Sequence, residues 1–266
     1  MNITESKFIK KYEEECPSFK LIDIKSIKKT IRLDNIKSVE LEKYKIKLEK
    51  IKKNLYSYNA DFNITSTLPY LDGKFFIQGE PSFDTVELLD PNSNEIILDM
   101  CAAPGSKTTH TSNLMKNKGT IVAIENNANR FKKLKFNLEK SKCENIICIQ
   151  EDATIFESKV KFDKILIDAP CSGNYTVEKD WFEKRTDFDI ENKARVQKKL
   201  IKNACNLIKK NGILIYSTCS LEKKEDEEIV EYAKKLGFKV LYEKKYWPHI
   251  ENTIGFYMAK LEYIGS

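Results

Sequence analysis

Residues 96–110, IILDMCAAPGSKTTH, decide the fold of this chain of 266 residues. The apolar run over 96–99 predicts a buried strand, and a loop of small residues follows it. We expect a helix to begin near Ser106, where the first backbone N–H groups lack partners within the helix and can bind a ligand. A strand, a tight loop and a helix in this order predict the first unit of a doubly wound α/β sheet. Ligands bind such sheets beyond the carboxyl ends of the strands.

The loop differs from two common nucleotide-binding loops. It has neither the G-x-G-x-x-G pattern of dinucleotide sites nor the G-K-[ST] order of a P-loop. An ordinary turn between a strand and a helix has a similar local pattern. The rest of the chain therefore has to show whether this loop binds a ligand.

The overall composition is typical of a soluble globular protein. Charged residues make up 32% of the chain and hydrophobic residues 41%. No run of 18 apolar residues is present and residues 1–15 lack the apolar core of a signal peptide, so we expect no contact with a membrane. The seven cysteines include no C-x-x-C pair, which predicts neither a disulfide framework nor a metal site. We therefore expect a reducing, cytoplasmic location. The net charge of +6 permits nucleic-acid binding.

The N-terminal quarter of the chain differs from the rest. Residues 1–60 are rich in Lys and Glu and contain no Gly. The patterns there predict helices over 4–15 and 39–55 and a weak strand over 26–33. We expect a small α+β lobe over residues 1–67 that contacts RNA, although a solvated cap without a ligand would have the same pattern. The Pro- and Gly-containing segment 68–82 marks the junction.

Residues 68–266 are expected to form a Rossmann-like domain. A short helix over 83–89 comes first, and apolar runs then alternate with helical patterns. The expected strands are 96–99, 121–124, 146–149, 165–167, 213–216, 239–242 and 255–263, and the expected helices are 127–140 and 194–209. This alternation predicts a mostly parallel sheet with helices on both faces.

Acidic residues follow the second and third strands of the expected sheet. Glu125 comes about 20 residues after the loop of small residues, where an acid typically binds the two hydroxyls of a ribose. Asp152 follows the third strand, where it could accept a hydrogen bond from an adenine amino group. A single acidic strand end is usually a solvated terminus. Two in succession beside such a loop predict a ligand that contains adenosine.

Cysteines follow the next two strands. The fourth strand leads into residues 168–173, DAPCSG, and the fifth leads into residues 216–220, YSTCS. Cys171 and Cys219 are therefore expected at neighbouring strand ends, beside the ligand. A thiolate is a strong nucleophile that can attack an electron-poor ring carbon, whereas most buried cysteines are small hydrophobes. Spacing and composition leave open which of the two attacks.

In this order and spacing, the motifs resemble the NOL1/NOP2/Sun family of RNA cytosine-5 methyltransferases. The resemblance covers residues 70–263 and is carried by DMCAAPGSKTTH, DAPCSG and YSTCS. Weaker similarities are GKFFIQGEPS, Gln197, the acidic run 225–228, the aromatic segment 255–257 and residues 30–33, a diverged form of the family's R-x-N strand. Residues 174–190 do not match the family's usual loop. Because no appended RNA-binding domain follows residue 266, we expect the N-terminal lobe to position the RNA.

The resemblance implies a methyltransferase that uses S-adenosylmethionine and forms a covalent bond between a cysteine and C6 of cytosine. It implies Cys219 as the nucleophile and Cys171 as the second cysteine, although DNA cytosine-5 methyltransferases use the position of Cys171 for attack. Asp168 is expected to hold ring N3, and Lys107 to assist Asp168 or contact cytosine O2. The implied cofactor-binding residues are Cys101, Ala102, Ala103, Pro104, Gly105, Ser106, Lys107, Glu125, Arg130, Asp152 and Asp168.

The expected substrate is tRNA, because the chain is compact. Ribosomal RNA methylation by the same chemistry is an alternative, and a non-catalytic RNA-binding assembly factor on the same scaffold is another. Intact Cys171, Cys219, Lys107 and Asp168 argue against the last of these. We expect a monomer that holds no metal.

Overall fold

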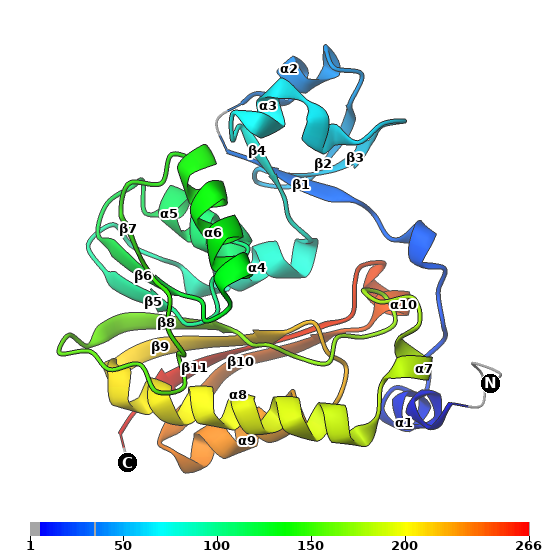
Figure 1. Cartoon of the computed structure of the whole chain (residues 1–266). Coiled ribbons are helices and arrows are strands. Elements are labelled where there is room, and N and C mark those ends of the chain that lie inside the picture. The colour runs from blue at the N-terminus through cyan, green and yellow to red at the C-terminus, as the bar shows by residue number, and fades with distance from the viewer. Residues whose placement is uncertain (1–5, 35, 266) are drawn as a thin grey trace.

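The larger of the two sheets in the computed structural model is the one that the sequence predicts, with helices on both faces (Figure 1). The structure describes residues 6–34 and 36–265. The seven strands lie in the order β10-β11-β9-β8-β5-β6-β7. Their bounds are β5 (Ile96–Asp99), β6 (Thr120–Ile124), β7 (Ile146–Ile149), β8 (Phe162–Asp168), β9 (Ile208–Thr218), β10 (Phe238–Tyr246) and β11 (Phe256–Tyr263). The five strands from β9 to β7 are parallel, and β11 is antiparallel to both of its neighbours, β9 and β10, so the α/β expectation is confirmed.

Helices cover the two faces of this sheet (Figure 1). One face carries α4 (Glu80–Leu89), α5 (Ser106–Leu114) and α6 (Ala128–Lys140), and the other carries α8 (Asp187–Leu207) and α9 (Glu227–Lys235). The short helices α7 (Trp181–Lys184) and α10 (Pro248–Glu251) lie near one end. Within the part of the chain that the structure describes, no helix combines the length and the apolar character needed to cross a membrane.

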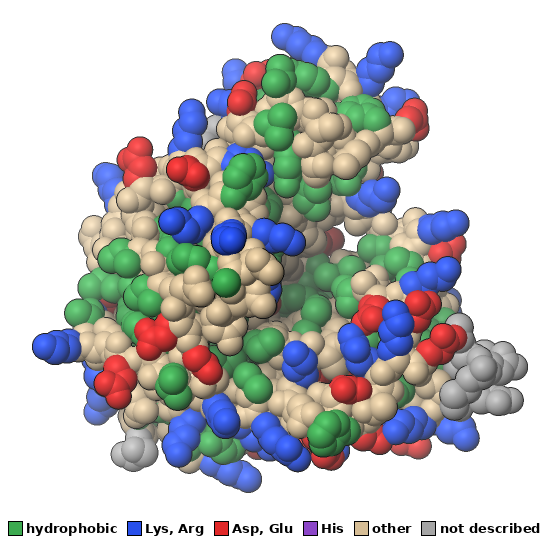
Figure 2. Space-filling view, viewed as in Figure 1, with side chains coloured by type: hydrophobic (Ala, Val, Ile, Leu, Met, Phe, Trp, Pro, Cys, Tyr) green, Lys and Arg blue, Asp and Glu red, His purple; other side chains and the backbone are tan. Residues whose placement is uncertain are grey.

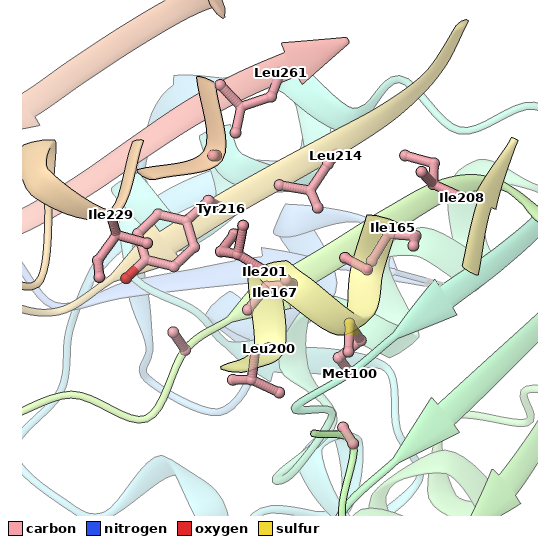
Figure 3. Packing of buried hydrophobic residues seen from close by; sticks show 14 of the residues in the cluster. Met100, Ile165, Ile167, Leu200, Ile201, Ile208, Leu214, Tyr216, Ile229 and Leu261 are labelled. Atoms are coloured by element: carbon pink, nitrogen blue, oxygen red, sulfur yellow. The ribbon is translucent and has the colours of Figure 1, made fainter. Parts of the chain in front are cut away.

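The central strands are apolar on both faces, as parallel strands under two layers of helices must be. Alternate residues of β8 and β9 therefore belong to different hydrophobic clusters, one on each face of the sheet. Ile165, Ile167, Leu214 and Tyr216 pack with residues of α8 and α9 (Figure 3). Leu166 and Ile215 point to the other side and join the cluster that includes Leu89 of α4. Both faces are thereby closed to water, and the carboxyl ends of the strands remain the open edge.

The smaller sheet forms the body of the N-terminal lobe, and all of its pairings are antiparallel. Its strands, in the order β2-β3-β1-β4, are β1 (Thr30–Leu33), β2 (Lys47–Lys52), β3 (Leu55–Asn59) and β4 (Phe75–Ile77). The lobe also contains α2 (Ser38–Glu42), α3 (Leu68–Leu71) and the 3₁₀ turns η2 (Ile24–Ser26) and η3 (Ile64–Ser66).

The predicted helix over 39–55 is wrong. Only α2 is helical, and the remainder forms the β2–β3 hairpin. Lys45 has a φ of 59°, which ends the helical course, and Lys53 turns the hairpin with a φ of 34°. Leu48 pairs with Tyr58 across the hairpin. The apolar spacing in this stretch suits a helix as well as a strand, and pairing with β3 decides between them.

Helix α1 (Lys7–Glu15) packs on the large domain instead of on the lobe. The predicted helix over 4–15 is confirmed from Lys7 onward, and its first two residues lie outside the described part of the chain. The Phe8 ring lies 4.8 Å from that of Trp181, and the Tyr12 hydroxyl donates to Glu222 at 2.8 Å. Strand β4 of the lobe, conversely, comes after residue 67. The chain thus passes from the large domain to the lobe and back.

A buried arginine joins the lobe to the start of α5. Arg32, on β1, is fully buried and forms an ion pair with Asp34. It also donates to the Ser106 carbonyl at 3.0 Å and to the Thr109 hydroxyl at 3.0 Å, both in α5. A further bond of 2.6 Å reaches the Gln78 side chain. The lobe is therefore attached directly to the helix that follows the loop of small residues.

Removing this cation should destabilise the protein, because the side chain of Asp34 is only 2% exposed and would lose its partner. We expect Arg32→Leu to lower the free energy of unfolding by about 3–5 kcal/mol. The double variant Arg32→Leu/Asp34→Leu should lose less, since it leaves no buried charge unpaired. Urea denaturation followed by circular dichroism measures both losses. A double variant that is less stable than Arg32→Leu would contradict this account.

Candidate active site

The carboxyl ends of the parallel strands surround a cavity of about 340 Å³, a volume typical of small-ligand sites. Five of the residues predicted from the sequence line this cavity: Cys101, Glu125, Arg130, Asp152 and Asp168. They come together because β7, β6, β5 and β8 are parallel neighbours whose ends meet at one edge of the sheet.

The backbone of residues 101–107 makes the main contacts between this loop and its neighbours. Gly105 precedes α5 with a φ of 106°, a region that favours glycine, and a Cβ there would lie 3.2 Å from Leu134. The Ala103 carbonyl accepts a bond of 2.7 Å from Arg130. The residues from Ala102 to Lys107 are not among the cavity-lining residues, and Lys107 contacts Asp168 instead.

Glu125 is almost fully buried at the end of β6 and is held in place from two sides. One of its oxygens accepts from the Asn127 backbone N–H at 2.9 Å, and the other lies 3.4 Å from the Arg130 guanidinium. Asp152 is exposed and accepts from the Thr154 N–H at 2.8 Å. The cavity thus presents one fixed buried carboxylate and one solvated carboxylate.

The two predicted cysteines meet beside this cavity. The sulfurs of Cys171 and Cys219 are 3.1 Å apart, within hydrogen-bonding distance. The hydrogen bond from Cys171 lowers the pKa of Cys219 below its ordinary value, against the opposing effect of burial. The same bond, together with burial, raises the pKa of Cys171 well above the ordinary value. The thiolate therefore forms preferentially on Cys219.

A charged pair lies next to the cysteines. The Lys107 ammonium is 2.7 Å from Asp168, and the Ser217 hydroxyl donates to the other oxygen of that carboxylate at 2.9 Å. Lys107 is also 5.5 Å from the centre of the Phe256 ring. The four residues predicted to be catalytic are thus connected, Cys171 with Cys219 and Lys107 with Asp168.

The pKa of Asp99, at the end of β5, is raised to about 7 by burial. Its carboxylate accepts from the Thr108 hydroxyl at 2.7 Å and from the Cys101 N–H at 3.3 Å. Asp99 therefore connects the strand to both ends of the loop that follows it.

Several residues at the site lie outside the predicted set. They are Met100, Asn126, Asn127, Glu151, Ala153, Thr154, Pro170, Lys193, Val196 and Leu200 around the cavity, and Ser217 and Phe256 near the charged pair. Asn126 and Glu151 are direct neighbours of predicted acids and could have been found on that basis. Val196 and Leu200 are four residues apart on α8. Apolar residues at this spacing also occur on any helix face that packs against the core, so the sequence does not single them out as cavity-lining residues.

The described residues, 6–34 and 36–265, contain His, Cys, Asp and Glu side chains of the kinds that bind metals. No group of three or more such side chains could hold a metal ion there.

Comparison with known proteins relates the chain to RNA methyltransferases. Residues 86–262 match the family model of the 16S rRNA methyltransferase RsmB/F. The chain is 37% identical over 204 residues to a tRNA (cytosine(72)-C(5))-methyltransferase of Pyrococcus horikoshii, covering 71% of this chain and 52% of that protein. It is 33% identical over 249 residues to the 25S rRNA (cytosine-C(5))-methyltransferase nop2 of Schizosaccharomyces pombe, covering 81% of this chain and 41% of that protein.

Solved structures agree with this relationship. A methyltransferase homologue from Pyrococcus horikoshii superposes with a TM-score of 0.80 at 30% identity, covering 89% of this chain and 86% of that one. The chain spans about half, or less, of the length of the two curated relatives above.

The different acidities of the two thiols can be tested without a substrate. Because thiolates react with iodoacetamide and thiols do not, the pH midpoint of alkylation should be lower for Cys219 than for Cys171. Cys171→Ala removes the hydrogen-bond donor, so the Cys219 midpoint should move to higher pH. Mass spectrometry of the alkylated peptides at a series of pH values measures each midpoint. Cys205→Ala, which alters a thiol bonded to the Ile201 carbonyl, is the control and should leave the Cys219 midpoint in place. An unchanged or lower midpoint in Cys171→Ala would refute the assignment.

Proposed function

The chain belongs to the NOL1/NOP2/Sun (RsmB/F) family of RNA cytosine-C5 methyltransferases, and we propose that it transfers a methyl group from S-adenosylmethionine to C5 of a cytosine in RNA. The main support is the pair of cysteines whose sulfurs are 3.1 Å apart, beside Lys107 and Asp168. A non-catalytic assembly factor would have no need for this arrangement.

The residues that line the cavity suit S-adenosylmethionine in charge and in hydrogen-bonding groups. Glu125 would accept from the two ribose hydroxyls, and Asp152 from the adenine amino group. Cys101, Arg130 and Asp168 line the same cavity and would contact the remainder. The carboxylates around the cavity favour a ligand with a positively charged sulfonium. When bound there, this cofactor supplies an electrophilic methyl group to C5.

The two cysteines divide the remaining chemistry between them. Cytosine C5 is a poor nucleophile until the Cys219 thiolate forms a bond to C6. The electron pair released from the ring double bond moves toward N3, where Asp168, once it has taken up a proton, would donate a hydrogen bond with Lys107 beside it. After methylation, Cys171 releases its own thiol proton to water and, as the thiolate, accepts the proton from C5. The double bond then forms again and the bond between Cys219 and C6 breaks.

The RNA would lie in the hollow between the lobe and the large domain. Figure 2 shows this side of the molecule, with apolar side chains inside the hollow and Lys and Arg side chains around its rim. The target cytosine must leave its stack to reach the cysteines. Residues 1–67 supply most of the lobe in our proposed division of the chain, and residues 68–266 supply the methyltransferase domain. Lys28, Lys29 and Lys47 line a groove on the lobe that suits an RNA backbone.

We infer that the substrate is tRNA, since a relative at 37% identity methylates tRNA. The rRNA methyltransferase among the relatives makes ribosomal RNA the second candidate. We propose that the protein methylates tRNA as a monomer in the cytoplasm. Bisulfite sequencing of RNA from cells that lack the protein would identify the substrate: a tRNA cytosine that loses its mark supports our proposal, and an rRNA cytosine supports the alternative.

Binding of S-adenosylmethionine should depend on Glu125. Glu125→Ala removes a charged acceptor for the ribose hydroxyls, so we expect the dissociation constant to rise by about 10- to 100-fold, equivalent to roughly 1.5–3 kcal/mol. Titration calorimetry measures it. Glu139→Ala changes an exposed acid on α6 away from the cavity and should bind like the wild type. Wild-type protein that gives no binding heat at saturating cofactor would reject this site.

The cysteine variants should differ in the covalent RNA complex that they form. Cys219→Ala should neither methylate RNA nor form an adduct, because no thiolate can add to C6. Cys171→Ala should add and methylate and then stall, because the proton on C5 is not removed. That variant should accumulate a protein–RNA band on a denaturing gel.

Two other results are informative. Normal turnover in Cys171→Ala would limit Cys171 to a structural role. An adduct in Cys219→Ala would reverse the two roles, with the nucleophile at the position that DNA enzymes use.

A further inference from the structure

The distance between the two cysteines is not set by local chain geometry. Cys171 and Cys219 follow different strands and are 48 residues apart in the sequence. Each cysteine is followed directly by a buried serine, Ser172 and Ser220. Contacts made by these two serines can therefore fix one cysteine relative to the other.

Both serines donate to the same carboxylate. Glu225 accepts from the Ser172 hydroxyl at 2.5 Å and from the Ser172 N–H at 2.9 Å. The Ser220 hydroxyl donates to the same side chain at 2.7 Å. Glu225, Ser172 and Ser220 are all 3% exposed or less. One buried side chain thus bridges the two cysteine loops.

The carboxylate of Glu225 is itself held in place. The Tyr216 hydroxyl, in the core packing of Figure 3, donates to the Glu225 carbonyl at 2.5 Å. Gln197, on α8, donates to the Glu225 carboxylate at 3.3 Å and to the Pro170 carbonyl at 3.1 Å. The bridge is therefore connected to β9, to α8 and to the residue before Cys171.

We propose that Glu225 is a positioning residue that holds the Cys171 and Cys219 loops at the separation that addition and elimination require. This role rests on the proposed function, but the geometry that it predicts can be measured without RNA or cofactor. Glu225 touches neither sulfur and is not a catalytic residue.

The negative charge of Glu225 indicates that this residue positions the two loops and does not activate the thiols. The negative charge of Glu225 raises the pKa of both thiols, which disfavours the thiolate needed for attack. A group placed there to activate a nucleophile would be positive. A carboxylate is, however, the side chain that accepts from several donors at once.

Glu225→Gln separates the two roles because it keeps the size of the side chain and removes its charge. If the charge mattered alone, both thiols would become more acidic and more reactive. If positioning matters, replacing one oxygen by a donor disrupts the bridge and separates the loops. The two roles therefore predict opposite signs for thiol reactivity.

The first test measures how readily the two sulfurs join. Diamide takes one proton and one electron from each thiol, which forms the disulfide while the diazene is reduced to a hydrazine. We expect Cys171–Cys219 disulfide formation, followed by peptide mapping, to be about tenfold slower in Glu225→Gln than in the wild type. Ser172→Ala, which removes one donor, should be slowed less and provides a second variant if Glu225→Gln fails to fold.

Glu222→Gln is the matched control. Glu222 is three residues away, is also buried, and its side chain accepts from Tyr12 without contacting either serine side chain. Its variant should oxidise at the wild-type rate. Disulfide formation in Glu225→Gln as fast as in the wild type, or faster, would overturn the proposal. In that case the bond of 2.9 Å from Asn174 to the Cys219 carbonyl would be enough to join the loops.

The second test measures methylation. We expect Glu225→Gln to lower kcat by about 100-fold while the KM for S-adenosylmethionine stays within about twofold, because the bridge lies outside the cofactor cavity. An unchanged kcat would overturn the positioning role. Wild-type protein that methylates neither tRNA nor rRNA would instead overturn the proposed function, and the diamide assay would still decide whether Glu225 holds the loops together.

Discussion

The parallel pairing of β8 with β9 is the constraint on which the candidate site depends. Asp168 and Ser217 are partners in this register, and their side chains are hydrogen-bonded. The chain leaves both strands at the same edge, so Cys171 and Cys219 arrive side by side after loops of only a few residues. Had the strands been antiparallel, the two loops would lie at opposite edges of the sheet.

Proximity alone would leave the cysteines equivalent, and their surroundings make them different. One thiol donates to the other, so the pKa of Cys219 falls while that of Cys171 rises. Two groups with separated pKa values in one pocket are suited to different steps of a reaction. The buried Glu225 opposes ionisation of both thiols, so the hydrogen bond between the cysteines is the main source of the asymmetry.

The lobe is attached to the large domain directly beside the loop of small residues. Arg32 binds the Ser106 carbonyl at the first residue of α5, directly after the loop of small residues. At the other end of the molecule, α1 packs on Trp181, whose indole N–H donates to the Ser172 carbonyl. Both parts of the N-terminal segment therefore contact elements next to the candidate site.

The sequence by itself determined the strands of the large sheet and the types of residue at their ends, because apolar runs, a glycine-containing loop and polar strand ends are local signals. Strands near 96–99 and 146–149, the acids Glu125 and Asp152, and both cysteine motifs could be read in this way. The tertiary structure decided what depends on contacts between distant residues. It turned residues 47–59 into a hairpin, placed α1 on the large domain, brought Val196 and Leu200 to the cavity and joined Ser172 to Ser220 through Glu225. None of these follows from spacing, since each depends on which surface a segment finally packs against.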